Sequence, residues 1–338
     1  MDRRSFLKWM GAVGVGLSPL MIADPFRERT REKPLASATL TRPLMGTIVT
    51  ATVLHPSGDR AREALEVAFA EMERLIPILD RHDPESPVSQ LNRQGVLRDV
   101  PSELQEVMVH AGRIHRLTRG AFDISIQPVL DLFEDSFSRK QTFPSEEEAR
   151  RAFRLVGAES IRSSGKEIRF LREGMGVSLD GIAKGYIVEK AVSRLKTLGV
   201  GHALINAGGD ILALGGRGDG EPWRIAIQDP LDRKGICQII PLRDGAVATS
   251  GDYERFFDPE KRYHHIIDPE TGYSPQRFTS VSVMAPRLTD ADALATAAFV
   301  PSPSRTLEFL RAFSETEALW IDRKGRQERT ENWPRARA

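Results

Sequence analysis

Strand-like and helix-like segments alternate along this chain from about Thr39, with only short turns between them. Residues 45–54 are rich in β-branched side chains, which favour strands, whereas residues 61–79 place apolar side chains at helical spacing. The 338 residues are enough for two medium-sized domains, but we find no internal repeat and no long low-complexity linker to separate them. The sequence therefore predicts a single elaborate α+β domain over residues 39–338, with helices packed on mixed sheets.

Prolines and glycines predict two further segments. Residues 80–92 contain two prolines and are expected to form a loop. Residues 101–120 are expected to form a helix that begins with Ser102 as its cap and ends at Gly120.

A small-residue turn leads into a helix after residues 176–179, which are expected to end a strand. The turn, through Asp180 and Gly181, would expose backbone N–H groups and the positive end of the helix dipole, which suits a phosphate. Lys184 adds a cation beside it. The turn matches neither a Walker loop nor GxGxxG, and tight packing is the alternative reason for its glycines. The helix is expected to end at Gly199 and to bury one face formed by Ile187, Ala191, Leu195 and Leu198.

A second cluster of small residues lies in the strand pair predicted over residues 203–214. It consists of Asn206, Gly208, Gly209 and Asp210. Glycines at this position could let the backbone approach a flat ligand.

Residues 289–299 predict a helix with an acidic first turn. Asp292 and Thr296 are four residues apart, so a carboxylate and a hydroxyl share one face. Hard oxygen ligands of this kind, with backbone carbonyls and a polyphosphate, are what Mg²⁺ prefers. The alternative is that Thr289 and Asp290 cap the helix while Asp292 complements its dipole. Spacing alone leaves both interpretations open.

Two adjacent histidines, His264 and His265, precede an Asp-Pro and a Thr-Gly pair. Neighbouring residues on an extended chain point to opposite faces, so one ring could pack while the other faces a site. The only cysteine, Cys237, excludes an internal disulfide and a cysteine-rich metal site.

The charge balance gives no reason to expect a nucleic-acid partner. Lys and Arg total 48 and Asp and Glu total 47, which leaves a formal net charge of +1. A nucleic-acid-binding domain usually carries a marked basic excess.

The first 38 residues are expected to be an export signal and linker. Arg3 and Arg4 precede an apolar, glycine-rich run that ends near Ala23, a pattern that resembles a twin-arginine signal. The run is too short and too weakly apolar for a transmembrane helix. Cleavage could follow Ala23 or residues 36–38. We therefore expect a protein that is exported, and that is periplasmic or associated with the inner membrane.

Seven motifs, in their order along the chain, closely resemble the ApbE-type FAD:protein FMN transferase family. The resemblance covers nearly all of the chain after the expected signal, and it implies an ApbE-like fold related to the T-fold. It also implies an enzyme that binds FAD and Mg²⁺, breaks the pyrophosphate, and transfers FMN through a phosphoester bond onto a threonine or serine of a target protein, releasing AMP. The motifs are MGT at 45–47, GAFDISIQPVLDLF at 120–133, SLDGIAKGYIVEKA at 178–191, INAGGDILALG at 205–215, TSGDYERFF at 249–257, HHIIDPETGYSP at 264–275 and DADALATAAF at 290–299.

The resemblance also implies roles for particular residues. The metal would be held by the carbonyl of Ala183, the carboxylate of Asp292 and the hydroxyl of Thr296. Asp180 stands where glycine is common, so its charge close to the diphosphate would make a metal counter-ion more necessary. The FAD site would be lined by Met45, Asp180, Lys184, Gly208, Gly209, Ser250 and Gly251, with His265 near the reacting phosphate.

A base would assist this reaction, because a threonine hydroxyl is a poor nucleophile at neutral pH. Removal of its proton by a positioned base contributes on the order of a hundredfold or more. His265 is the candidate base and Asp292 the competing one, whereas His264 should point away. The metal would stabilise charge on the phosphoryl oxygens, with attack in line at the FMN-side phosphorus.

Two other functions remain open at this point. An FAD pyrophosphatase would use the same site with water in place of the acceptor hydroxyl, giving FMN and AMP. A non-catalytic flavin-binding protein would need no base beside the phosphate. For the transferase, the expected partner is an extracytoplasmic flavoprotein, such as a subunit of a membrane redox complex.

Overall fold

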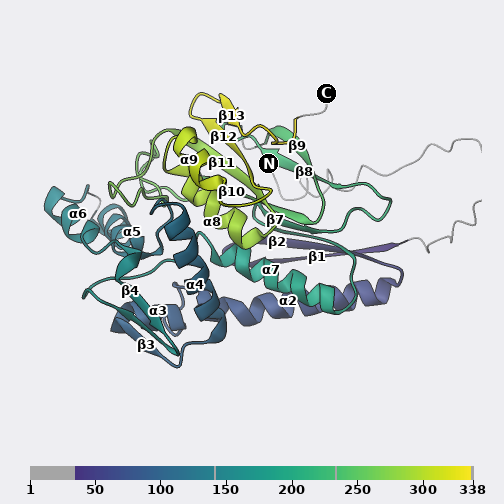
Figure 1. Ribbon diagram of the computed structural model, residues 1–338, viewed down its shortest axis with the longest axis horizontal. Coiled ribbons are helices and arrows are strands. Elements are labelled where there is room, and N and C mark those ends of the chain that lie inside the picture. The colour runs from purple at the N-terminus through teal and green to yellow at the C-terminus, as the bar shows by residue number, and fades with distance from the viewer. Residues whose placement is uncertain (1–34, 141, 233, 336–338) are drawn as a thin grey trace, which may run out of the picture. The chain divides into compact units, whose positions relative to one another are not determined.

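An eight-stranded antiparallel sheet forms the framework of the protein, as its computed structural model shows (Figure 1). The strand order is β1-β2-β6-β7-β10-β11-β12-β13. Neighbours in the sequence are therefore neighbours in the sheet along most of its width, which is typical of hairpin connections. These strands span Ala36–Leu44, Thr47–His55, His202–Ala207, Asp210–Leu214, Gly245–Gly251, Phe278–Ala285, Glu317–Asp322 and Gln327–Arg329.

The structure describes residues 35–335, apart from residues 141 and 233. The predicted export signal lies almost entirely outside the described residues. The described part forms one compact unit from Leu35, which confirms the single α+β domain. Strand β1 begins at Ala36, before the Thr39 at which the sequence predicts the domain to start, because Ala36 is already paired with His55 of β2.

Both faces of the large sheet are covered. Helices α2 (Gly58–Leu79), α7 (Ala183–Thr197) and α8 (Leu288–Phe299) pack on one face, and the two-stranded sheet of β8 (Trp223–Gln228) and β9 (Ile236–Leu242) lies on the other. Side chains in β7 alternate between the two cores, since Leu212 belongs to the helical side while Ile211 and Ala213 belong to the β8–β9 side. A strand buried on both faces reads as a continuous apolar run.

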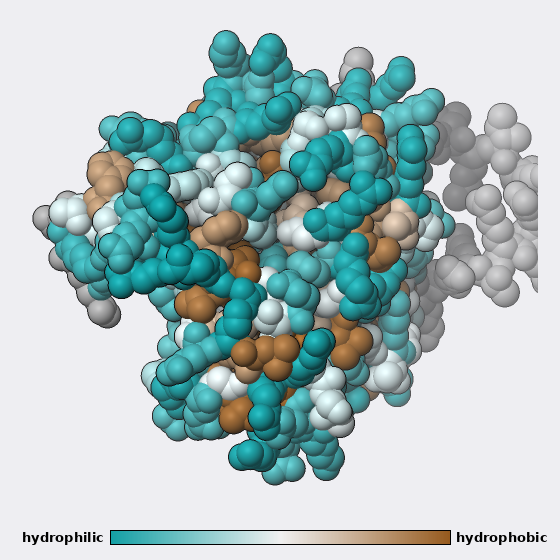
Figure 2. All heavy atoms as spheres, turned by 60° about the vertical axis from the view of Figure 1, so that its left-hand side comes forward, coloured by the Kyte–Doolittle hydropathy of each residue, from teal (hydrophilic) through white to brown (hydrophobic). Residues whose placement is uncertain are grey.

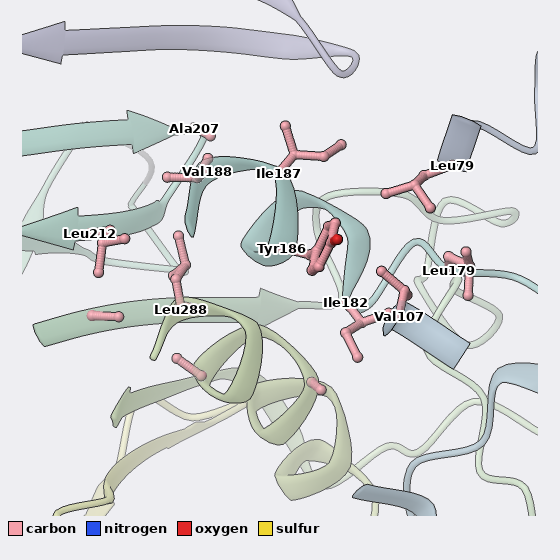
Figure 3. Close-up of a cluster of buried hydrophobic side chains, with 14 of the residues drawn as sticks. Leu79, Val107, Leu179, Ile182, Tyr186, Ile187, Val188, Ala207, Leu212 and Leu288 are labelled. Atoms are coloured by element: carbon pink, nitrogen blue, oxygen red, sulfur yellow. The ribbon is translucent and has the colours of Figure 1, made fainter. Parts of the chain in front are cut away.

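Helix α7 is central to the helical layer. Figure 3 shows Ile182, Tyr186, Ile187 and Val188 between side chains of the neighbouring helices and of the sheet. Three of the four residues predicted for its apolar face are buried, but Leu198 is 48% exposed because it is the C-cap residue. Gly199 ends the helix with φ of +75°, as predicted.

The remaining elements surround the helical layer. A three-stranded sheet in the order β3-β5-β4 consists of Val96–Arg98, Glu167–Phe170 and Ile161–Ser164. The other α-helices are α3 (Pro87–Gln94), α4 (Ser102–Leu117), α5 (Gln127–Glu134), α6 (Glu146–Phe153) and α9 (Pro303–Leu310), and the short η elements are η1 (Ile124–Ile126), η2 (Asp135–Lys140) and η3 (Ala158–Ser160). No helix in the described part of the chain is long and apolar enough to cross a membrane.

Three local predictions were wrong. Residues 80–92 are not all loop, because α3 begins at Pro87, a proline tolerated in the first turn of a helix, and Ser86 caps it. Ser102 is the first residue of α4 rather than its cap, since Pro101 occupies the capping position. Residues 176–179 form no strand; the Asn92 side chain instead bonds both backbone groups of Val177.

Candidate functional site

The N-terminal turns of α7 and α8 meet in direct contact. The backbone N–H of Gly185 donates to Asp292 Oδ2 at 2.9 Å, and Asp292 is only 5% exposed. A Cβ atom at Gly185 would lie 2.6 Å from the Leu288 carbonyl oxygen and 2.9 Å from Asp292 Cβ. Only a glycine therefore lets the two helices approach this closely.

The hydroxyl of Thr296 lies at the same junction. Its Oγ1 is 3.2 Å from Ser250 Oγ, and a Cβ atom at Gly181 would lie 3.0 Å from it. Ala183 stands midway between Gly181, which faces Thr296, and Gly185, which is bonded to Asp292. The structure thus brings Asp292, Thr296 and Ser250 close to the start of α7, whereas the role of the Ala183 carbonyl stays a prediction.

The capping alternative for the acidic turn of α8 was wrong. Arg287 is the N-cap residue, and no side-chain cap bond is made. Glu189 of α7 instead accepts from the backbone N–H and the hydroxyl of Thr289 at 3.1 and 2.7 Å. Asp290 lies 2.8 Å from His110 Nε2. Asp292, in contrast, accepts from the Gly185 N–H of α7.

A second buried carboxylate, which the sequence did not single out for a role, joins the site. Lys184 Nζ lies 2.7 Å from Asp210 Oδ2, and the Asp210 side chain is buried. Burial alone would lower the pKa of Lys184, but Asp210 and Asp292 outweigh it and raise that pKa. Burial, and next the charge of Asp210, raise the pKa of Asp292, while Lys184 partly offsets them. The one signal in the sequence was the position of Asp210 beside the Gly208-Gly209 pair.

The donor set fits Mg²⁺. The two buried carboxylates of Asp210 and Asp292 lie near one ammonium, that of Lys184, and burial followed by the charge of Asp210 raises the pKa of Asp292. Nowhere in residues 35–335, as described, do three or more His, Cys, Asp or Glu side chains gather as a metal-binding group. A metal here would therefore use the hydroxyl and backbone carbonyl as well, an all-oxygen set that suits Mg²⁺.

Two tight turns lie at one end of neighbouring strands β2 and β6. Met45 and Gly46 connect β1 to β2, and Gly208 and Gly209 connect β6 to β7. Met45 has φ of +53° and is half-buried, whereas no atom lies within 4 Å of a Cβ atom built on Gly209. A side chain at Gly208 would collide with Thr47. The backbone at Gly209 is therefore open on this side, and its approach to a flat ligand stays a prediction.

The Ser250-Gly251 pair ends β10. Ser250 reaches Thr296, as described above, but Gly251 is buried and serves packing. A Cβ atom there would lie 2.5 Å from the Tyr253 ring. Ser250 thus lies beside Thr296 while Gly251 lies against the Tyr253 ring, and the contact of this pair with FAD stays a prediction.

His265 is held by one backbone carbonyl. Its backbone N–H and its ring Nδ1 both lie 3.0 Å from the carbonyl oxygen of Arg255. Because that oxygen can only accept, Nδ1 carries the proton and Nε2 keeps a free lone pair. Burial lowers the pKa of His265 to about 4, so the ring is neutral at pH 7. A neutral, half-buried imidazole of fixed tautomer can accept a proton.

His264 faces the opposite way, as predicted. It is fully buried, its Nε2 donates to the Pro275 carbonyl at 3.0 Å, and its ring packs edge-on against Phe299 at 5.6 Å. Its backbone N–H bonds Ser274 Oγ at 2.8 Å. His264 therefore anchors the loop that carries His265.

Stability should fall between pH 7 and pH 5 because of His264. Burial lowers its pKa to about 4, below the roughly 6.5 expected in the unfolded chain. Between those values the unfolded chain binds more protons, so this stability is complete above pH 6.5 and is lost as pH falls. The loss at pH 5 from His264 alone should be about 2 kcal/mol, and His265, whose pKa is lowered equally, adds to it. Urea unfolding at both pH values would test this. His264→Gln should show a flatter pH dependence; an equally steep one would contradict the assignment.

Asp180 is paired with arginines of the protein itself. Its Oδ2 lies 2.9 Å from Arg81 Nε and 3.9 Å from Arg255 Nη1. Because these two guanidinium groups balance its charge, Asp180 does not by itself make a metal counter-ion more necessary, contrary to the expectation from the sequence. These ion pairs could not be predicted from the sequence, since the three residues are 75 to 174 positions apart in the chain.

Comparisons of both the sequence and the structure match this chain to known proteins. The model of the ApbE family matches residues 45–320. The FAD:protein FMN transferase of Vibrio cholerae serotype O1 is 31% identical over 290 residues, covering 83% of this chain and 86% of the relative. That of Treponema pallidum is 34% identical over 285 residues, 76% of each chain. The solved ApbE protein of Thermotoga maritima superposes with a TM-score of 0.79 at 30% identity, covering 88% of this chain and 97% of that one. The apo flavinyl transferase ApbE of Pseudomonas stutzeri gives 0.76 at 28% identity, covering 88% and 96%.

Proposed function

The chain belongs to the ApbE family, and from this we propose that it transfers FMN from FAD to a threonine or serine hydroxyl of an acceptor protein, with release of AMP. The observation that carries the proposal is the junction of α7 and α8. There the carboxylate of Asp292 and the hydroxyl of Thr296, both possible metal ligands, lie near the turn before Gly185, and the ammonium of Lys184 is close by. A protein that only stored flavin would not need this arrangement together with a neutral histidine.

We propose that Mg²⁺ is held by the Ala183 carbonyl, Asp292 and Thr296. Bound there, it would supply Lewis-acid stabilisation of charge on the phosphoryl oxygens and on departing AMP. Lys184 adds a positive charge for the pyrophosphate, and the open turn at Gly209 accommodates a flat part of FAD. These assignments rest on the donor set and its burial.

His265 is the base in this proposal. Its Nε2 takes the proton of the acceptor hydroxyl as that oxygen attacks the FMN-side phosphorus in line. The new oxygen–phosphorus bond forms while the bond from that phosphorus to the bridging oxygen breaks, and the electron pair leaves with AMP. Asp292 is less suited to this role, because a carboxylate that holds a metal and accepts from Gly185 has its lone pairs engaged.

We also propose that the protein acts outside the cytoplasm. Arg3 and Arg4 with the following apolar run support export through the twin-arginine route to the periplasm or the inner-membrane surface. The acceptor would then be an extracytoplasmic flavoprotein, such as a subunit of a membrane redox complex.

The first test incubates the full chain with FAD, Mg²⁺ and a candidate acceptor domain, followed by intact mass measurement and AMP assay. Transfer predicts an acceptor mass gain equal to FMN and one AMP per acceptor. AMP with free FMN and an unlabelled acceptor would indicate an FAD pyrophosphatase instead. Intact FAD throughout would contradict both enzymatic functions.

His265→Gln should slow transfer on the order of a hundredfold, because the acceptor hydroxyl loses its base. The matched control is His202→Gln, since His202 Nδ1 makes the same kind of bond, to the Gly216 carbonyl at 2.9 Å, at the start of β6. The control should keep the wild-type rate. Single-turnover rates measured from acceptor mass would decide, and an unaffected rate in His265→Gln would remove it as the base.

A further inference from the structure

Four charged side chains from four separate elements form a closed ring of ion pairs. Arg81 follows α2, Glu134 ends α5, Asp180 precedes α7, and Arg255 lies in the connection from β10 to β11. Arg81 lies 2.9 Å from Asp180 and 3.6 Å from Glu134, while Arg255 pairs with Glu134 and lies 3.9 Å from Asp180. Each charge thus contacts two of opposite sign.

The ring has one buried member. The Arg81 side chain is only 4% exposed, whereas the side chains of Asp180, Glu134 and Arg255 are 31 to 42% exposed. A planar guanidinium can contact two carboxylates at once in a fixed geometry, which a lysine ammonium on a flexible stem does less well. Arg81 is therefore the buried member of the ring, hydrogen-bonded to Asp180 through Nε and facing Glu134 at the longer distance of 3.6 Å.

The ring reaches the site at two points. Asp180 leads into the start of α7, where the Gly185 N–H donates to Asp292 and Gly181 lies beside Thr296. Arg255 supplies the carbonyl that holds both the backbone N–H and the ring Nδ1 of His265. A displacement of residue 255 would therefore allow the His265 ring to adopt its other tautomer and would change the distance of that ring from the α7–α8 junction.

We infer that Arg81, Glu134, Asp180 and Arg255 are positioning residues, which set the orientation and the tautomer of His265 relative to the α7–α8 junction. This inference rests on the proposed flavin transfer. The members of the ring act through the loop that they brace, and none of them needs to touch the reacting phosphorus. The expected effect is one of alignment, since a misplacement of about 1 Å can slow a reaction on the order of a hundredfold.

The test uses Glu134→Gln, an isosteric change of a half-exposed residue that removes one charge from the ring. We expect kcat for transfer to fall about tenfold, because misalignment acts on the reacting geometry, while KM for FAD stays within about twofold. Arg81→Lys, which keeps the charge but removes the fork, should give a similar loss. The matched control is Glu308→Gln, since Glu308 pairs with Arg119 at 3.0 Å between exposed side chains elsewhere on the surface.

A second measurement separates positioning from a general loss of stability. Nitrogen-15 NMR of the histidine rings should show His265 protonated on Nδ1 alone in the wild type, and a mixture of tautomers in Glu134→Gln. If the wild type transfers FMN and Glu134→Gln keeps both its kcat and the single tautomer, the inference is wrong. If the wild type fails to transfer FMN, the proposed function is wrong, and the tautomer comparison still tests the ring.

Discussion

Asp292→Asn should reduce FMN transfer by at least about a thousandfold, since the loss of metal-assisted charge stabilisation removes several kcal/mol from the transition state. Asparagine keeps the size of the side chain and an oxygen that can accept from Gly185, so α7 and α8 should stay together. What disappears is the buried negative charge that would hold the cation. Chelation of Mg²⁺ should stop the wild-type enzyme in the same way, and added Mg²⁺ should restore it.

The control for this change is Asp290→Asn in the same helical turn. Asp290 bonds His110 on α4 and takes no part in the α7–α8 junction. The Asp290→Asn variant should transfer FMN at a rate close to that of the wild type. Calorimetric titration with Mg²⁺ in the presence of FAD, together with AMP release, would measure both variants. Wild-type metal affinity in Asp292→Asn would contradict the assigned ligand set.

The largest structural effect is expected from Gly185→Ala. The new methyl group would meet the Leu288 carbonyl at 2.6 Å and Asp292 Cβ at 2.9 Å, and neither atom belongs to a flexible side-chain end. The helices must then separate, which should cost about 3 kcal/mol of unfolding free energy, as overpacked cores do. The bond from Gly185 to Asp292 would stretch, so transfer should be lost as well.

Gly112→Ala in α4 is the matched control, because Gly112 is also a helical glycine. A Cβ atom there would lie 3.7 Å from the end of the Arg116 side chain, an ordinary contact. Alanine has a higher helix propensity than glycine, so Gly112→Ala should be as stable as the wild type or up to about 1 kcal/mol more stable. Urea unfolding of both variants provides the comparison. Equal stability of Gly185→Ala and the wild type would show that the close approach of α7 and α8 is dispensable.

The face of the molecule shown in Figure 2 has hydrophobic side chains only in separate patches among hydrophilic ones. This agrees with a formal net charge near zero that is spread over both signs. This face therefore presents no single large apolar surface.

Features governed by near neighbours in the chain were predictable. The strand over residues 45–54, the helix over residues 61–79 and the glycine end of α7 follow from periodicity and turn chemistry. Asp292 and Thr296 share a face because residues four apart in a helix do so in any protein. The motif order then allowed the family to be identified.

Contacts between distant segments had to come from the tertiary structure. Glu189 of α7 accepts hydrogen bonds from Thr289 at the start of α8, and Asp210 of β7 pairs with Lys184 of α7. The Arg81 ring joins residues up to 174 positions apart in the chain. Which of two adjacent histidines would be buried was also decided by packing against Phe299 and Pro275. The sequence by itself determined which chemical groups are present and their local geometry, whereas the folded core determined their partners, because burial and charge pairing depend on segments that only the fold brings together.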